Sequence, residues 1–134
     1  MPHPITEIKG LDSDTRAKLE AAHIMTLEDL LRATATPSQR AALAKQIGVA
    51  ESQLTGWVNR ADLMRIKGVG TEMANLLELC GVDSCKELQH RTAQHLHDKL
   101  KEINDAKKIT NHAPTLTQVD EWISEAKIIS AKPL

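Results

Sequence analysis

Apolar residues recur along the chain at spacings of three and four positions. Leu43 and Ile47 are four residues apart in the first half, and Leu96, Leu100 and Ile103 follow the same pattern in the second half. This spacing gives each helix one apolar stripe that it can bury. No segment alternates apolar and polar residues with the period of a strand. The pattern therefore predicts an all-α protein built from short helices.

Hydroxyl side chains mark the places where several of these helices begin. At four points a Ser or Thr is followed three positions later by an acid or an amide, which is the pattern of a capping box. These four segments are 26–29, 36–39, 84–87 and 115–118. Pro37 follows its Thr directly and suits the first helical position. Gly48 and Gly81 are predicted to end helices in the left-handed conformation, which glycine adopts without a Cβ clash.

The chain also repeats itself at an offset of 58 positions. The sequence IKG at 8–10 recurs at 66–68, and further matches follow at the same offset downstream. Because the match covers nearly the whole chain, we expect two tandem repeats of about 60 residues, each with about five helices, packed as one compact unit. The first repeat is placed at 1–61 and the second at 62–134.

The composition agrees with a helical globular protein. Of the 134 residues, 41% are hydrophobic and 26% are charged, and the chain holds two Trp but no Phe or Tyr. A core of Leu, Ile, Val, Ala and Met suits helices, whereas strands favour aromatic residues. The net charge of −1 provides no overall field toward nucleic acid or membranes. No apolar run has the length of a membrane span and no signal peptide is evident, so the expected location is the cytoplasm.

The second repeat contains a glycine turn between two predicted helices, with the sequence IKGVGTEMANLL at 66–77. This arrangement of two glycines, an apolar residue between them, and then Ala with an apolar pair resembles the helix-hairpin-helix signature. Gly68 and Gly70 are expected to permit a tight turn, Val69 to fill the core, and Ala74 to let two helices cross closely. The whole chain resembles an uncharacterised bacterial and archaeal family of paired helix-hairpin-helix units.

The resemblance implies that this hairpin contacts DNA. In helix-hairpin-helix proteins the exposed amides of the turn contact a phosphate of duplex DNA without reading its sequence, and helix N-termini suit anions in general. Carried onto this chain, the implied contacts are Arg65, Lys67, Gly68, Val69, Gly70 and Thr71. The backbone supplies most of them, and the Lys67 ammonium and the Thr71 hydroxyl assist.

The first repeat departs from this signature. Asp12 stands in place of the second glycine, Arg16 in place of the alanine, and His23 in place of the glycine that matches Gly81. Asp12 and Asp14 can cap a helix, but their negative charges repel a polyanion. DNA contact is therefore not expected at the first hairpin.

The two cysteines and the histidines suggest a zinc site, which we weigh against a structural role. Cys80 and Cys85 align with apolar positions of the first repeat, and their spacing to His90, His95 and His97 matches no established ligand pattern. We therefore predict reduced cysteines in the core and no metal or other cofactor.

The two tryptophans hold equivalent places near the ends of the two repeats. Trp57 and Trp122 are therefore predicted to anchor helices, and no exposed aromatic platform for single-stranded bases is expected. The sequence also carries no motif that pairs a nucleophile with a base or two carboxylates in one site, so no enzymatic activity is expected.

These observations support two functions of different classes. The leading prediction is a non-catalytic adaptor whose second hairpin binds the backbone of duplex DNA weakly and without sequence preference. The alternative is a protein-interaction scaffold in which the first repeat, or the groove between the repeats, receives a helix of a partner protein.

Overall fold

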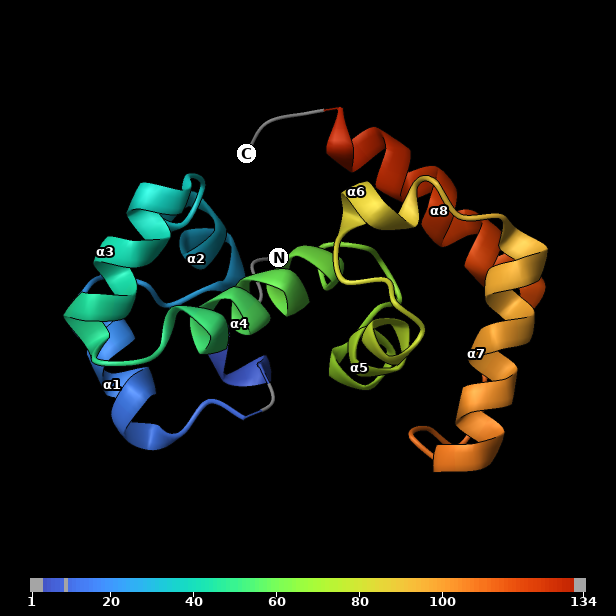
Figure 1. Ribbon diagram of the computed structural model, residues 1–134, viewed down its shortest axis with the longest axis horizontal. Coiled ribbons are helices and arrows are strands. Elements are labelled where there is room, and N and C mark those ends of the chain that lie inside the picture. The colour runs from blue at the N-terminus through green and yellow to red at the C-terminus, as the bar shows by residue number, and fades with distance from the viewer. Residues whose placement is uncertain (1–3, 9, 132–134) are drawn as a thin grey trace. The chain divides into compact units, whose positions relative to one another are not determined.

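The computed structural model describes residues 4–8 and 10–131, and the regular elements in these ranges are helices (Figure 1). A short 3-10 helix, η1 (Ile5–Glu7), precedes eight α-helices. One isolated antiparallel bridge joins Pro4 to Thr26. The prediction of an all-α protein is confirmed. None of the helices in the described ranges is long and apolar enough to cross a membrane.

The chain divides into two compact units, and the division falls after Asp62. The helices of the first unit are α1 (Ser13–Ala21), α2 (Leu27–Ala33), α3 (Pro37–Ile47) and α4 (Glu51–Leu63), of which α4 ends one residue into the second unit. Helix α3 packs against both α1 and α2. The largest fully buried side chains of the first unit are aliphatic: Ile5, Leu19, Leu27, Leu30, Ile47 and Leu54.

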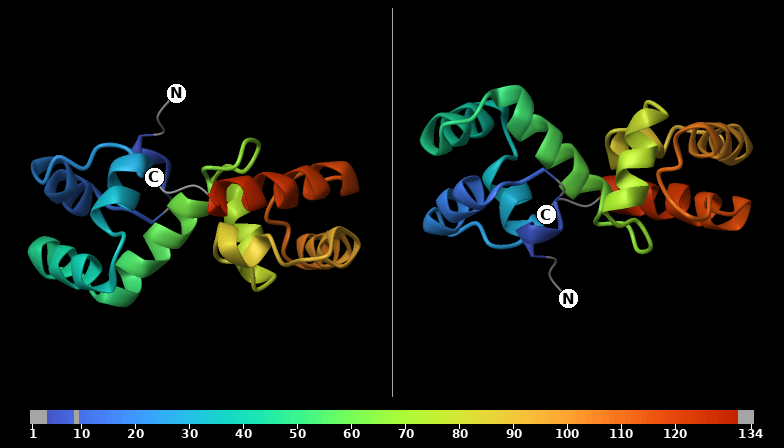
Figure 2. Two further views of the ribbon diagram at one scale, coloured as in Figure 1. Left: turned by 90° about the horizontal axis from the view of Figure 1, so that it is seen from above. Right: turned by 90° about the horizontal axis from the view of Figure 1, so that it is seen from below.

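The second unit begins at Leu63 and contains the other four helices. They are α5 (Thr71–Leu79), α6 (Cys85–Leu88), α7 (Ala93–Lys107) and α8 (Leu116–Ser130). Helix α8 packs against α6 and α7, and α7 also contacts α5; Figure 2 shows α7 and α8 side by side. The core of this unit is again aliphatic, with Leu63, Ile66, Leu76, Leu77, Leu88 and Leu100 fully buried.

Side-chain caps begin most of the helices at the predicted residues. Complete capping boxes form at Thr26, Thr36 and Thr115, each with the acid or amide three positions later. At Ser84 the hydroxyl accepts from the Glu87 amide at 3.1 Å, and this is the half of the box that the structure records. Local spacing alone therefore positions these four helix starts.

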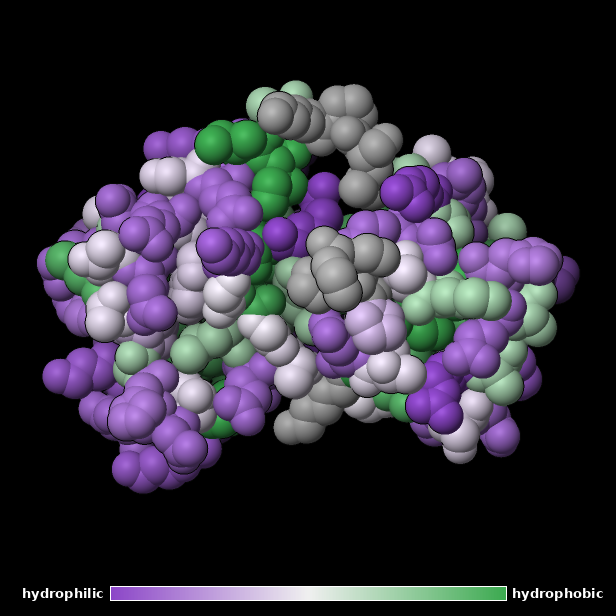
Figure 3. Space-filling model, turned by 180° about the vertical axis from the view of Figure 1, so that it is seen from behind, coloured by the Kyte–Doolittle hydropathy of each residue, from purple (hydrophilic) through white to green (hydrophobic). Residues whose placement is uncertain are grey.

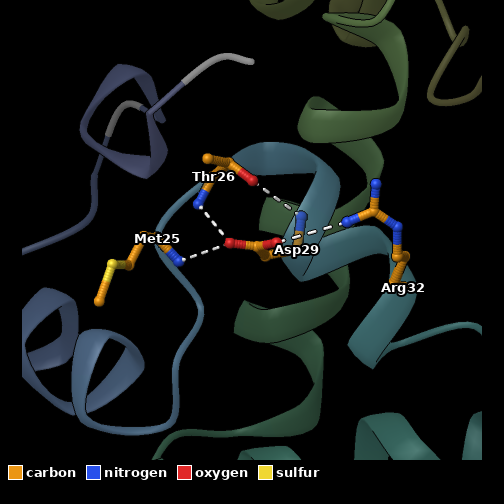
Figure 4. A network of polar contacts seen from close by, with 4 residues as sticks. All are labelled: Met25, Thr26, Asp29 and Arg32. Atoms are coloured by element: carbon orange, nitrogen blue, oxygen red, sulfur yellow. Dashed lines mark hydrogen bonds and ion pairs between the residues drawn. The ribbon is translucent and has the colours of Figure 1, made fainter.

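The capping box of α2 shows how such a cap is built (Figure 4). The Thr26 hydroxyl accepts from the Asp29 amide at 3.0 Å, and Asp29 Oδ2 accepts from the amides of Met25 and Thr26 at 3.1 and 3.2 Å. Arg32 Nη1 lies 3.4 Å from Asp29 Oδ1. These contacts lower the pKa of the Asp29 carboxyl, with the hydrogen bond from the Met25 amide as the largest cause.

Helix ends also agree with the sequence at the predicted glycines. Helix α3 ends before Gly48, which has a φ of 72°, and α5 ends just before Gly81, which has a φ of 86°. His23 has a φ of 63° and so adopts the left-handed conformation despite its Cβ. Histidine is among the non-glycine residues that tolerate this region best.

The number of helices is close to the expectation of about five in the first unit and one lower in the second. Over the described residues there are four α-helices to a unit, with η1 in addition in the first. Helices α7 and α8 each run for 15 residues. Neither contains a Gly or Pro that would break it, so each continues as one long helix.

The residues predicted to be structural are buried. Trp57 and Trp122 are 9% and 4% exposed, and Cys80 and Cys85 are buried and form no disulfide in the described part of the chain. The prediction of core cysteines and packed tryptophans is confirmed.

Across the face seen in Figure 3, most of the described surface is hydrophilic.

Candidate functional site

The predicted hairpin is a turn that leads from α4 into α5 within the second unit. Two short backbone hydrogen bonds fold it: the Ile66 amide donates to the Leu63 carbonyl at 3.1 Å, and the Val69 amide donates to the Ile66 carbonyl at 3.0 Å. Val69 is 4% exposed and Ala74 is fully buried, which are the packing roles predicted for them. Lys67 and Gly68 lie at the surface.

Two features of this turn favour glycine at position 68. Its φ of 90° lies in the region that residues with a Cβ rarely adopt. A Cβ at this position would also lie 3.3 Å from Trp122 Nε1 on α8. Trp122 thus packs beside the turn, which gives this buried tryptophan a structural role in the second unit.

Gly70 does not meet the same requirement, and the expectation that both glycines permit the turn is wrong for this one. Its φ of −91° is open to other residues, and a Cβ there would meet nothing within 4 Å. Gly70 is the N-cap of α5, and its carbonyl accepts from the Ala74 amide at 2.9 Å. Its lack of a side chain leaves the first amides of α5 without a side-chain cap.

The polar groups around this helix start are unequal in their exposure. Lys67 is exposed, whereas Arg65 and Thr71 are half-buried. The Thr71 hydroxyl is shielded from solvent and has no hydrogen-bond partner among the described residues. Glu72 lies in the first turn of α5 and is exposed, as Lys67 is. Its negative charge therefore opposes the attraction of an anion by Lys67. The arrangement suits a weakly held anion more than a tightly enclosed one.

Glu125 contacts the turn, and no pattern in the sequence predicts this contact. The backbone amide of Lys67 donates to Glu125 Oε1 at 3.3 Å, so a carboxylate of α8 already lies against one of the amides assigned to phosphate. Glu125 follows the turn by 58 residues in the chain and belongs to no motif. Only the packing of α8 brings it there.

In the first unit, Asp12 stands at the position that matches Gly70. Asp12 is the N-cap of α1, and its Oδ1 accepts from the Thr15 amide at 2.7 Å. This bond is the main cause of the lowered pKa of the Asp12 carboxyl. The prediction that Asp12 caps its helix is confirmed, and its charge occupies the place where an anion would approach.

The remaining candidate groups do not assemble into a metal centre in the part of the chain that the structure describes. No three side chains of His, Cys, Asp or Glu gather there in a group that could hold an ion. Burial raises the pKa of the Cys80 thiol, and the positive charges of Lys99 and Arg91 oppose this shift. A raised thiol pKa makes Cys80 a poor nucleophile and metal ligand.

An open groove of about 510 Å³ lies in the first unit, lined by the end of α1 and the residues after it, the end of α2, and α3. Its lining contains no Lys, Arg, Asp or Glu and consists of Ala21, Ala22, His23, Ile24, Ala33, Gln39, Ala42, Leu43 and Gln46. Small side chains in such a wall permit close approach of another backbone.

Comparison with known proteins places the chain in a family. The sequence model of "Domain of unknown function (DUF4332)" matches residues 9–129. The chain belongs to the DUF4332 family. No curated protein and no solved structure matches the chain. The DUF4332 match runs from before α1 almost to the end of α8, and it assigns no activity to the site.

Proposed function

We propose that this DUF4332 chain is a non-catalytic helix-hairpin-helix adaptor that binds the backbone of duplex DNA weakly and without sequence preference. The contacts are made by the turn at 66–71, through its amides and the Lys67 ammonium, with Arg65 and Thr71 beside them. The observation that carries the proposal is the exposed turn of Lys67 and Gly68, which leads into a helix that no side chain caps.

The weakness of this binding follows from the charges at the turn. One lysine and a few amides neutralise few phosphates, and each neutralised phosphate adds to the affinity by releasing counterions. Glu72 opposes the approach of a polyanion, and Glu125 competes for the Lys67 amide. Such a module contributes useful affinity in a larger assembly, where several weak contacts act together.

The proposal treats the chain as two helix-hairpin-helix repeats, and equivalent backbone geometry supports this. Gly10 and Gly68 both have a φ of 90°, and α1 and α5 each begin three residues later. After each helix, the amide of Ile24 or Val82 donates to the carbonyl of a leucine at 2.9 Å. These pairs are 58 positions apart, as in the sequence repeat.

A second candidate function is a protein-interaction scaffold, and the groove of the first unit favours it. The alanine-rich wall suits an apolar helix of a partner protein more than a charged ligand. Ala42 lies at the surface of this wall. If the scaffold function holds, Ala42→Glu abolishes the capture of a partner from cell extract, whereas Lys45→Glu on the same helix leaves it intact.

The DNA proposal is tested by fluorescence anisotropy of a labelled duplex at two low salt concentrations. We expect binding by the wild type, with a slope of log affinity against log salt of roughly −1 to −3. Lys67→Glu abolishes this binding. Lys101→Glu makes the same change of charge at an exposed position of α7 and serves as the matched control.

Each outcome of this titration bears on the proposal. Loss of binding in Lys67→Glu with binding retained in Lys101→Glu supports the hairpin as the contact. Equal loss in both variants indicates attraction to the overall charge and contradicts a hairpin site. Absence of binding by the wild type at low salt overturns the DNA function and favours the scaffold.

A further inference from the structure

The second unit has a hollow of about 230 Å³ beside the start of α7. Two cationic side chains, two imidazoles, one hydroxyl and one apolar residue form its wall: Arg91, Lys99, His90, His95, Thr92 and Leu96. Leu96 is buried, whereas the polar groups reach the surface. No carboxylate is among these lining residues, and each of the five polar ones can donate a hydrogen bond.

Arg91 is held in place at this wall. Its Nη2 donates to the Gly81 carbonyl at 3.1 Å and to Glu87 Oε1 at 2.6 Å. These two contacts reduce the entropy that the guanidinium would lose when it binds a ligand. They also offset part of its charge, which makes Lys99 the main source of attraction for an anion.

Lys99 and His95 lie one turn apart on α7, so both side chains project from one face of the helix. The positive charges of Lys99 and Arg91 both act to lower the pKa of the buried Cys80 thiol, so both side chains lie near it. Glu102 acts on the same thiol with opposite sign. The site therefore has a modest positive character.

The helix backbone adds to this character. The N-cap of α7 is Thr92, whose side chain makes no capping hydrogen bond, and the first turn of α7 contains no acid. The positive end of the helix dipole therefore reinforces the lining cations.

We infer that this hollow binds a phosphoryl group. An arginine, a lysine, imidazole donors and a hydroxyl match the several oxygens and the negative charge of such a group. The volume lies below the range of about 300–1,000 Å³ typical of pockets that enclose a whole small-molecule ligand, so one phosphoryl group fits better than a complete nucleotide. The site is independent of the hairpin and stands whether or not the hairpin binds DNA.

The test is a titration of the full chain with sodium phosphate, followed by amide NMR at constant ionic strength against sodium chloride. We expect saturable shifts of the amides at 92–96. Lys99→Gln weakens the binding by about fivefold, which corresponds to the upper range for an exposed charge pair. Lys101→Gln, on the same helix and outside the lining, leaves it unchanged.

A second titration with duplex DNA distinguishes the two sources of the phosphoryl group. Shifts at 92–96 with both titrants assign the site to a backbone phosphate, and shifts with inorganic phosphate alone assign it to a small phosphorylated ligand. Either result supports the inference. No saturable shift with phosphate, or equal weakening in both lysine variants, overturns it, and circular dichroism of each variant establishes that it is folded.

Discussion

The two glycines of the turn, Gly68 and Gly70, differ in how well another residue could replace them. Gly68 has a left-handed φ and faces Trp122 at close range, whereas Gly70, two residues later, has an ordinary φ and open space around it. The signature in the sequence predicted both glycines for one reason. It could not separate them, because the neighbour that restricts Gly68 is supplied by α8 from a distant part of the chain.

This contrast predicts that substitutions at the two glycines have different effects on stability. Gly68→Ala lowers the free energy of unfolding by about 1–2 kcal/mol, because alanine is strained at a positive φ. Gly70→Ser either raises the free energy of unfolding or lowers it by less than about 0.5 kcal/mol, since serine is a good N-cap. Urea denaturation followed by circular dichroism measures both, and equal effects of the two substitutions would contradict the account.

Glu125 is the residue at which the structure adds most to the sequence. If the hairpin binds phosphate, the carboxylate against the Lys67 amide competes with it. Glu125→Gln is therefore expected to raise the affinity for duplex DNA by more than Glu121→Gln, which removes the same charge from an exposed position one turn earlier on α8. Anisotropy titrations of both variants measure this, and equal affinities would show that the contact does not limit binding.

At the scale of the helical element, local rules were sufficient to place most helix starts. Each capping box involves residues three positions apart, so the sequence contains everything that the box requires. The second unit has one helix fewer than expected, since α7 and α8 each continue for 15 residues without a break. How these helices pack against one another was not predicted from the sequence. Short-range chemistry was predictable here, and long-range packing was not.

The capping box of α2 predicts a dependence of stability on pH. The pKa of Asp29 is lowered from its ordinary value of 3.8 in the folded chain, so its contribution to stability is complete above that value and is lost as pH falls through the lower, folded pKa. Asp29→Asn keeps an acceptor oxygen but does not titrate. Thermal unfolding should therefore show a deficit of the variant at neutral pH that shrinks below about pH 4.

The difference in stability between Asp29→Asn and the wild type isolates the effect of the Asp29 charge. Asp12, whose pKa is also lowered, is present in both proteins, so its effect cancels in the difference. A deficit that stays constant from neutral to acidic pH would show that the charge of Asp29 does not stabilise the capping box.

At the scale of the whole molecule, the sequence predicted the fold class and the family resemblance better than the site. The all-α architecture follows from periodicity, composition and caps, each of which is distributed along the chain. The site depends on a few contacts between distant residues, such as those of Glu125 and Trp122 with the turn. Membership of the DUF4332 family places the chain among its relatives without assigning a ligand, so the function rests on these contacts.

The central claim is that the second hairpin contacts the phosphate backbone, and amide NMR tests it most directly. Isotope-labelled protein is titrated with a short duplex at low salt, and the amides at 67–71 are followed together with those at 10–13 in the first unit. The account predicts saturable shifts at 67–71 that reverse on addition of salt, with the amides at 10–13 unchanged. Shifts of similar size at both hairpins, or none at 67–71 when the duplex is in excess, would contradict it.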